Sequence, residues 1–184
     1  MMQHLHLRRQ WLSSILVLLS LSSTSGQEPV PPDCSTAEAA QFDFWVGSWQ
    51  VTWSDSASGK NRVDKVLDDC VIVEHFDGRP GGPLQGLSVS TYDRSTQRWR
   101  QTWVDNNASY LDFVGGWEGD RMILSRQAQR DGQTFRQRMV WYAIAADSLE
   151  WNWERSDDEG ETWKVLWQIH YRRQHPDTDE VPGG

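Results

Sequence analysis

The chain is predicted to fold as an all-β protein, an up-and-down antiparallel β-barrel of about ten strands with a short N-terminal helix. Three observations predict this fold. From Gly47 onward, apolar and polar residues alternate with a period of two. Turn signals such as Asp131-Gly132 recur along the whole of this region. Between Leu84 and His175 there is no proline, as expected where strand pairing needs every backbone N–H.

Residues 1–26 have the composition of a cleaved secretory signal peptide. A basic start with Arg8 and Arg9 leads into an apolar run at residues 15–19, and small residues follow, with the cut expected near Gly26. The run is too short and too rich in serine for a stable membrane span. We therefore expect a secreted or periplasmic protein, exported behind an ordinary basic leader or by the twin-arginine route.

The chain is acidic, with 18 Lys and Arg against 26 Asp and Glu and a formal net charge of −8. Signal cleavage would remove Arg8 and Arg9 and no acidic residue, so the mature chain would be more acidic still. Such a surface repels phosphate backbones and anionic lipids. Nucleic acid and, after cleavage, membranes are therefore not expected as partners. A homodimer is left open.

Cys34 and Cys70 are expected to form a disulfide in an oxidising compartment, and two buried free thiols are the alternative. Two cysteines with scattered histidines match no usual zinc spacing, so neither a metal nor another cofactor is expected. The proline-containing residues 27–34 are expected to form an extended linker. The barrel domain is expected over residues 35–174, and residues 175–184 are expected to form a disordered acidic tail.

The short helix is predicted over about residues 36–44 because Ser35-Thr36-Ala37-Glu38 fits a capping box. In this motif the Ser35 hydroxyl and the Glu38 carboxylate each satisfy a free N–H at the helix start. The apolar end of the segment, Phe42, Phe44 and Trp45, would then cover one end of the barrel.

Ten strands follow from the alternation and from the turn residues between them. They are predicted at residues 47–54, 61–67, 70–77, 85–93, 98–105, 109–115, 120–128, 133–143, 148–156 and 162–173. The turns are placed at Ser58-Gly59, Gly81-Gly82, residues 93–95, 105–107 and 118–120, and Asp131-Gly132. Hairpins throughout favour a barrel over a sandwich with long crossings.

The last hairpin contains the pattern Ser-x-Asp-x-Gly-x-Thr-Trp at residues 156–163. This run resembles the Asp box known from sialidase propellers. It occurs once, in a chain too short for a propeller, so its role is expected to be structural. Asp158 would accept turn N–H groups, Gly160 would supply a positive φ, and Trp163 would pack on the hairpin.

Candidate ligand-binding residues lie on the strand faces predicted to point inward. Trp163, Val165, Trp167 and Tyr171 share one such face, and polar side chains lie among the tryptophans of other strands. These faces form either a filled aromatic core or the lining of a cavity. The candidate ligand-binding residues are Glu74, Ser88, Tyr92, Gln101, Trp103, Trp153, Trp167 and Tyr171.

The sequence leaves two other functions open beside interior binding. A small barrel enzyme of the isomerase or cyclase type could use Glu74 for acid–base chemistry, and a structural or partner-binding module would have a filled core. The sequence has no nucleophile elbow, phosphate loop or zinc helix, so no catalytic residue is assigned. Haem held by His170, as in nitrobindins, is not expected because the apolar face of its strand directs His170 outward.

Gly47-x-Trp49 opens the first strand and Arg173 ends the last. Trp49 is expected to plug one barrel end, with the Arg173 guanidinium stacked on its indole. This pairing resembles the lipocalin (calycin) superfamily. Residues 42–49, 74–76, 92–93 and 101–105 resemble DUF1579, a lipocalin-like family of secreted bacterial proteins of unknown function, over nearly all of residues 34–173. The resemblance implies a barrel that binds a small, partly apolar molecule in its interior.

Overall fold

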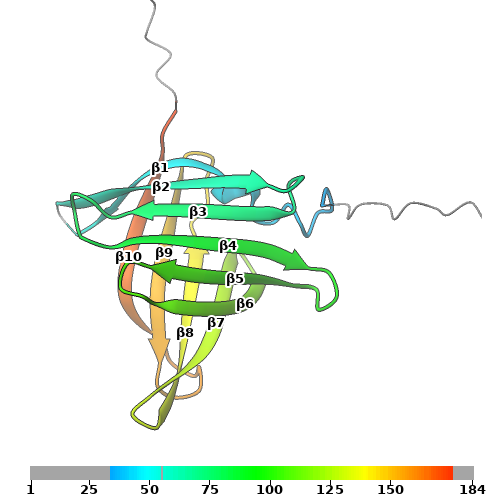
Figure 1. Cartoon of the computed structure of the whole chain (residues 1–184). Helices are drawn as coiled ribbons and strands as arrows, with labels where there is room; N and C mark the ends of the chain where they lie inside the picture. Colours follow the sequence, from blue (N-terminus) through cyan, green and yellow to red (C-terminus); the bar gives the residue numbers. More distant parts are fainter. Residues whose placement is uncertain (1–33, 55, 176–184) are drawn as a thin grey trace, which may run out of the picture. The chain divides into compact units, whose positions relative to one another are not determined.

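The computed structural model describes residues 34–54 and 56–175. They form an all-β closed barrel of ten antiparallel strands, as predicted (Figure 1). Each strand pairs with the next along the chain, and β10 pairs with β1 to close the sheet. The strands are β1 (Gly47–Trp53), β2 (Ala57–Val66), β3 (Val71–Asp77), β4 (Gln85–Asp93), β5 (Arg98–Asp105), β6 (Tyr110–Glu118), β7 (Arg121–Arg130), β8 (Gln133–Tyr142), β9 (Ser148–Ser156) and β10 (Lys164–Arg173).

The first hairpin turns earlier than the sequence suggests. Ser58 and Gly59 lie within β2, paired with Thr52 and Val51, rather than in the turn. Ser54 carries the positive φ of 58° at this turn. Gly59 is needed for a close approach instead, since a Cβ there would come within 2.4 Å of the Asp77 carbonyl oxygen.

The helix predicted over residues 36–44 is replaced by a series of turns that ends in a three-residue 3-10 helix, η1 (Asp43–Trp45). Most backbone hydrogen bonds here join residues three apart, such as the one from Asp43 N–H to the Ala40 carbonyl. This spacing aligns residues i and i+3 on one side. Phe42 and Trp45 lie on this side and are both buried in the barrel end.

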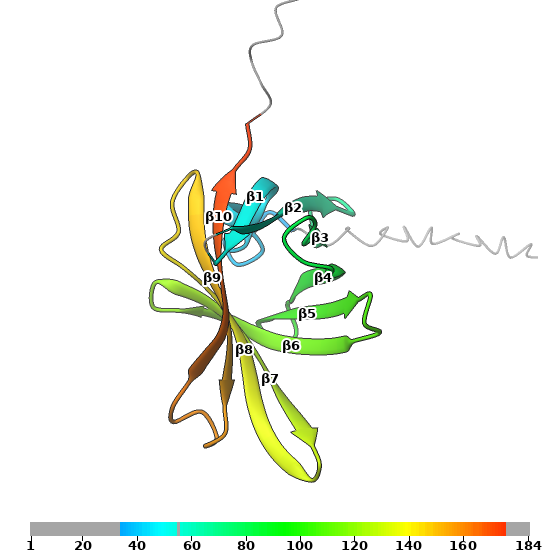
Figure 2. The same cartoon turned by 90° about the vertical axis from the view of Figure 1, so that its left-hand side faces the viewer.

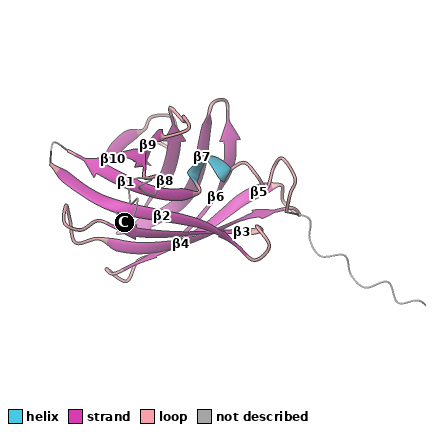
Figure 3. Ribbon diagram, turned by 90° about the horizontal axis from the view of Figure 1, so that it is seen from above, coloured by secondary structure: helices cyan, strands magenta, loops and turns pink. Residues whose placement is uncertain are grey.

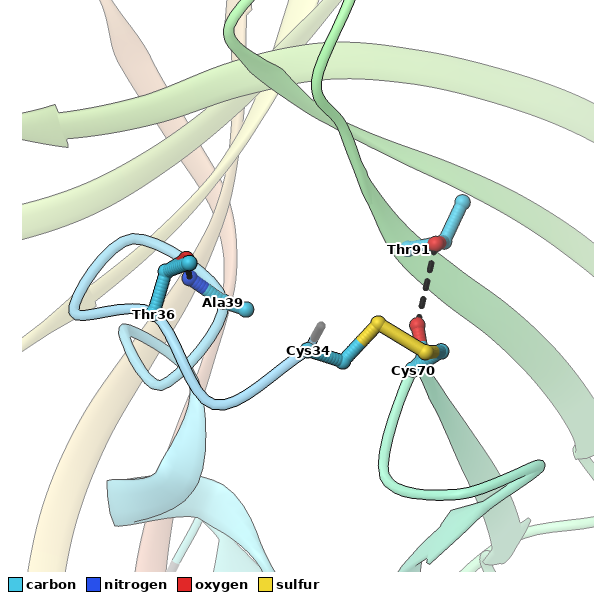
Figure 4. The surroundings of a disulfide bond; sticks show 5 residues. All are labelled: Cys34, Thr36, Ala39, Cys70 and Thr91. Carbon is cyan, nitrogen blue, oxygen red and sulfur yellow. Dashed lines mark hydrogen bonds between the residues drawn. A yellow bond between two sulfur atoms is a disulfide. The ribbon is translucent and has the colours of Figure 1, made fainter. Parts of the chain in front are cut away.

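Cys34 and Cys70 form the predicted disulfide, with a sequence separation of 36 residues (Figure 4). The bond ties the N-terminal segment to the turn before β3. The Cys70 carbonyl also accepts a hydrogen bond from the Thr91 hydroxyl on β4, at 3.0 Å. By the chain-entropy model, closing a loop of this length stabilises the fold by about 4 kcal/mol.

One end of the barrel is closed by what we call the plug, the side chains of Phe42, Trp45, Trp49 and Trp99. All four are almost fully buried. Phe42 meets Trp99 edge to face at 4.8 Å between ring centroids, and η1 lies across this end of the strands (Figure 3). The Trp49 indole N–H donates to the Trp45 carbonyl at 2.8 Å. This end is therefore filled by aromatic rings.

Arg173 joins the plug to the closing strand. Its guanidinium carbon lies 4.1 Å from the centroid of the Trp49 ring. Its nitrogens donate to three backbone carbonyls, those of Phe44, Val46 and Ala146, at 2.7–3.0 Å. The guanidinium thus connects the N-terminal segment, β1 and the loop before β9.

The hairpins β7–β8 and β9–β10 extend beyond the closed ring of strands (Figure 2). At the tip of the second, Asp158 accepts hydrogen bonds from the backbone N–H and the hydroxyl of Thr162. Gly160 has a φ of 100°. The Trp163 indole donates to the Gly160 carbonyl at 3.1 Å and packs on the Arg138 guanidinium, 3.9 Å from the ring centroid.

The inward alternation predicted for β10 is wrong at its start. The pairing with β9 shifts register between Val165 and Trp167. Val165 is consequently 49% exposed instead of facing inward, and the ring of Trp163 packs on Arg138. Beyond this β-bulge the alternation holds, with Ile169 and Tyr171 buried.

Candidate functional site

The barrel interior contains a cavity of about 200 Å³ on the far side of Trp141 from the plug. The Trp141 ring packs on Phe42 and Trp45 and also lines the cavity. Most of the lining is aromatic, including Trp103, Trp141, Trp151, Trp153 and Trp167. An engineered apolar cavity of about 150 Å³ holds benzene, and drug-sized ligands need roughly 300 Å³ or more. This cavity therefore suits a molecule of one or two rings.

Glu74 of β3 is the charged residue in this lining. Its side chain is buried, and each carboxyl oxygen accepts one hydrogen bond at 2.7 Å, from Asn61 Nδ2 on β2 and from the Ser88 hydroxyl on β4. Burial raises the pKa of Glu74 from 4.5 to about 7, although both hydrogen bonds act to lower it. Glu74 can thus change protonation state near neutral pH.

Tyr171 of β10 lies beside Glu74 through a shared partner. The second Asn61 Nδ2 hydrogen is donated to the Tyr171 hydroxyl oxygen, at 3.0 Å. Burial, and the nearby Glu74, raise the pKa of Tyr171 well above its usual value. The hydroxyl therefore stays protonated at neutral pH and presents a neutral polar group in the cavity wall.

The structure divides the eight candidate ligand-binding residues into two groups. Those in the cavity lining are Glu74, Trp103, Trp153, Trp167 and Tyr171. The other three do not line it. Ser88 supports Glu74, Tyr92 packs on Trp99 at the plugged end, and Gln101 donates to the Ser90 hydroxyl at 2.8 Å.

Asn61 is the residue that the sequence reasoning missed. Its side chain is 1% exposed and holds both Glu74 and Tyr171. The signal was present, because Asn61 and the inward-facing Val63 are two positions apart on β2 and so share a face. Trp141 was missed as well, although it shares a face with Met139 in β8 in the same way.

His170, the candidate haem ligand, lies on the outer face of β10. It is exposed, and its Nδ1 lies 2.5 Å from a carboxyl oxygen of Glu150. Neither histidine nor cysteine is present in the cavity lining. Within residues 34–54 and 56–175, no three His, Cys, Asp or Glu side chains gather as a metal site would require.

A ten-strand antiparallel barrel with an interior cavity is the architecture of lipocalin-like proteins, and the fold here agrees with that class. The chain belongs to the DUF1579 family, described as proteins of unknown function, whose model matches residues 36–173. A search of curated proteins finds no match.

The disulfide fits a protein of an oxidising compartment. In the part of the chain that the structure describes, no helix has the length and apolar character needed to cross a membrane. The predicted signal peptide, most of the linker and nearly all of the tail lie outside the described residues.

Proposed function

We propose that this protein binds a small, largely apolar molecule inside the barrel. The observation that carries the proposal is the aromatic cavity of about 200 Å³ with one buried carboxyl group, that of Glu74, in its wall. A filled-core module would have no such cavity, because protein interiors are normally close-packed. A ligand bound against this apolar lining would remove it from water, which is why the cavity supports binding over a filled-core module.

The test is a direct measurement of ligand in the cavity. The mature chain, exported through its own signal, is analysed by native mass spectrometry and then titrated with indole in a calorimeter. We expect either a co-purified small-molecule adduct or uptake of one indole per chain. The same preparation reports the site of signal cleavage, which tests the proposed secreted or periplasmic location.

A matched pair of variants locates the binding. Leu111→Trp places a larger side chain in the cavity lining and should abolish uptake. Val89→Trp makes the same kind of change on the outer face, where Val89 is exposed, and should leave uptake unchanged. Equal binding by both variants, or neither adduct nor uptake in the folded wild type, would overturn the proposal.

A small barrel enzyme is the second candidate, favoured by the pKa of about 7 at Glu74. A carboxyl group with this pKa in an apolar cavity suits proton transfer to and from carbon, with the neutral Tyr171 as a hydrogen-bonding partner for the substrate. The probe is 2-cyclohexenone in deuterated water, with deuterium uptake followed by NMR. Exchange that depends on Glu74, and is lost in Glu74→Gln, would support it; exchange no faster than in buffer would oppose it.

The partner predictions rest on charge alone. We expect no binding to nucleic acid or to anionic vesicles, because the chain carries a net charge of −8. Size-exclusion chromatography with light scattering distinguishes a monomer from the homodimer that the sequence leaves open.

A further inference from the structure

We propose that the ligand of the interior cavity is a small cyclic organic amine, bound as its ammonium ion, with the nitrogen at Glu74 and the ring among the indoles. This inference rests on the proposed binding function and specifies the chemical class that the site selects.

The charge of the site favours a cationic ligand. Glu74 is contacted by Asn61 from β2 and by Ser88 from β4, with Tyr171 of β10 nearby, and none of these groups can carry a positive charge. Among the described residues, no Lys, Arg or His forms an ion pair with it. An ionised carboxylate buried without a counter-ion is costly. An ammonium ligand would supply the missing positive charge.

Glu74 can accept more hydrogen bonds than the protein supplies. A carboxylate offers about four acceptor sites, and the protein occupies two of them. Ammonium N–H groups can donate to the others. A neutral hydrocarbon would leave these sites unsatisfied, and a carboxylate ligand would bring two acids together, which disfavours the charged form of both.

The aromatic rings that line the cavity favour a cyclic ligand. The Trp167 ring meets those of Trp53, Phe76 and Trp151 nearly at right angles, with centroids 5.5–5.9 Å apart. Trp167, Phe76 and Trp151 all line the cavity. These edge-to-face contacts hold the rings as an apolar aromatic wall, against which the ring of the ligand can pack while its nitrogen lies at Glu74. The net charge of −8 further favours the approach of a cation.

Arg126 of β7 is the positively charged group that would favour an anionic ligand instead. Its guanidinium carbon lies 5.9 Å from the centroid of the Phe113 ring, which lines the cavity. This guanidinium is not itself in the lining, and its Nη1 donates to the Gln137 side-chain oxygen at 2.8 Å. An anionic ligand directed by Arg126 is therefore the competing outcome, and the experiment includes a probe for it.

Binding of an ammonium ion should be coupled to the proton on Glu74. Burial places the pKa of Glu74 near 7 in the empty site, and a cation favours the ionised form, so the ligand displaces a proton at lower pH. Affinity for an amine should therefore be constant between pH 7 and the pKa of the amine itself, and fall by up to about tenfold for each pH unit below 7.

The experiment compares three probes of similar size and different charge: benzylamine, benzyl alcohol and benzoate. Each is titrated calorimetrically into the oxidised mature protein near pH 6 and pH 8. At pH 8 we expect benzylamine to bind at least about tenfold more tightly than benzyl alcohol, which corresponds to one ion pair of about 1.4 kcal/mol. Benzoate should be the weakest of the three. Near pH 6, titration in two buffers of different ionisation enthalpy should show up to one proton released per benzylamine bound.

Glu74→Gln should reduce benzylamine binding to the level of benzyl alcohol and remove the proton release, while benzyl alcohol still binds. The control is Glu118→Gln, which removes an exposed acid at the end of β6 and should change neither. The comparison of probes on the wild type does not depend on either variant folding well.

Each result decides the proposal. Benzyl alcohol binding as tightly as benzylamine, or no proton release, would overturn the amine and leave interior binding intact. Benzoate binding most tightly would also overturn it and would implicate Arg126. If neither these probes nor indole bind and the purified chain carries no adduct, the binding function itself fails together with the amine.

Discussion

The plugged end and the cavity are built from the same kind of side chain, yet one is filled and the other is hollow. Phe42, Trp45, Trp49 and Trp99 are at most 2% exposed, and the Phe42 ring packs on the rings of Trp45 and Trp99. In the cavity, Trp103, Trp151, Trp153 and Trp167 are only partly buried. The difference is the N-terminal segment, which inserts Phe42 and Trp45 into one end. Aromatic content alone therefore does not decide whether a barrel interior is closed; a segment from outside the strands does.

The largest effect is expected from removing a ring of the plug. Trp45→Ala should lower the free energy of unfolding by about 3–5 kcal/mol, because it opens a void among rings that cannot collapse. Trp167→Ala should cost less than about half as much, since that ring borders existing space. Urea denaturation of both variants measures the difference. Equal losses would mean that the two ends are packed alike.

The disulfide should stabilise the plugged end in particular. Replacing both partners, Cys34→Ser with Cys70→Ser, should lower the free energy of unfolding by roughly 2–4 kcal/mol. Hydrogen exchange should rise first in residues 36–46, the segment that the bond tethers, while amides of β8 and β9 beside the cavity change little. Uniform loss of protection would show that the bond stabilises the whole barrel and not one end.

Glu74 should make the cavity end sensitive to pH in a way that the plug is not. Its pKa is about 7 in the folded protein against 4.5 ordinarily, so the folded state holds the proton more tightly. Stability is then full below pH 4.5, falls as pH rises to 7, and is level above that, a total loss of roughly 3 kcal/mol from this one group. Glu74→Gln removes the titration.

The measurement is the free energy of unfolding of wild type minus Glu74→Gln from pH 4.5 to pH 8. Acids with lowered pKa values, such as Asp77 and Asp158, cancel in this difference. As the pH rises, the wild type should lose roughly 3 kcal/mol of unfolding free energy relative to Glu74→Gln. A flat difference would mean that the Glu74 carboxyl is hydrated and the cavity wet.

Much of the barrel could be predicted from the sequence because strand alternation and turn residues are local signals. The failures come from tertiary contacts. The segment at residues 36–44 has helical caps, but it takes turns and a short 3-10 helix where Phe42 and Trp45 are buried in the barrel end. Ser58-Gly59 has turn chemistry, but Gly59 is required by the approach of Asp77.

The candidate site was predictable in part for the same reason. Period-two alternation finds inward side chains such as Glu74 and Trp153, but it gives no depth along the barrel axis. Gln101 therefore looked equivalent to Trp103, although only Trp103 borders the cavity. Asn61 shows the limit most clearly, because it joins Glu74 on the neighbouring strand to Tyr171, which is far from it in sequence.

The smallest effect is expected at the seam that joins the plug to β10. Arg173→Lys keeps the charge but cannot reproduce three hydrogen bonds to separate carbonyls together with stacking on Trp49. We expect a loss of about 1–2 kcal/mol in the free energy of unfolding, with a change in Trp49 fluorescence and unaltered uptake of indole by the cavity. Arg172→Lys, on the exposed side of the same strand, is the matched control and should be neutral. A loss of indole binding in Arg173→Lys would show that the two ends are coupled, and that the plug shapes the cavity as well as closing the barrel.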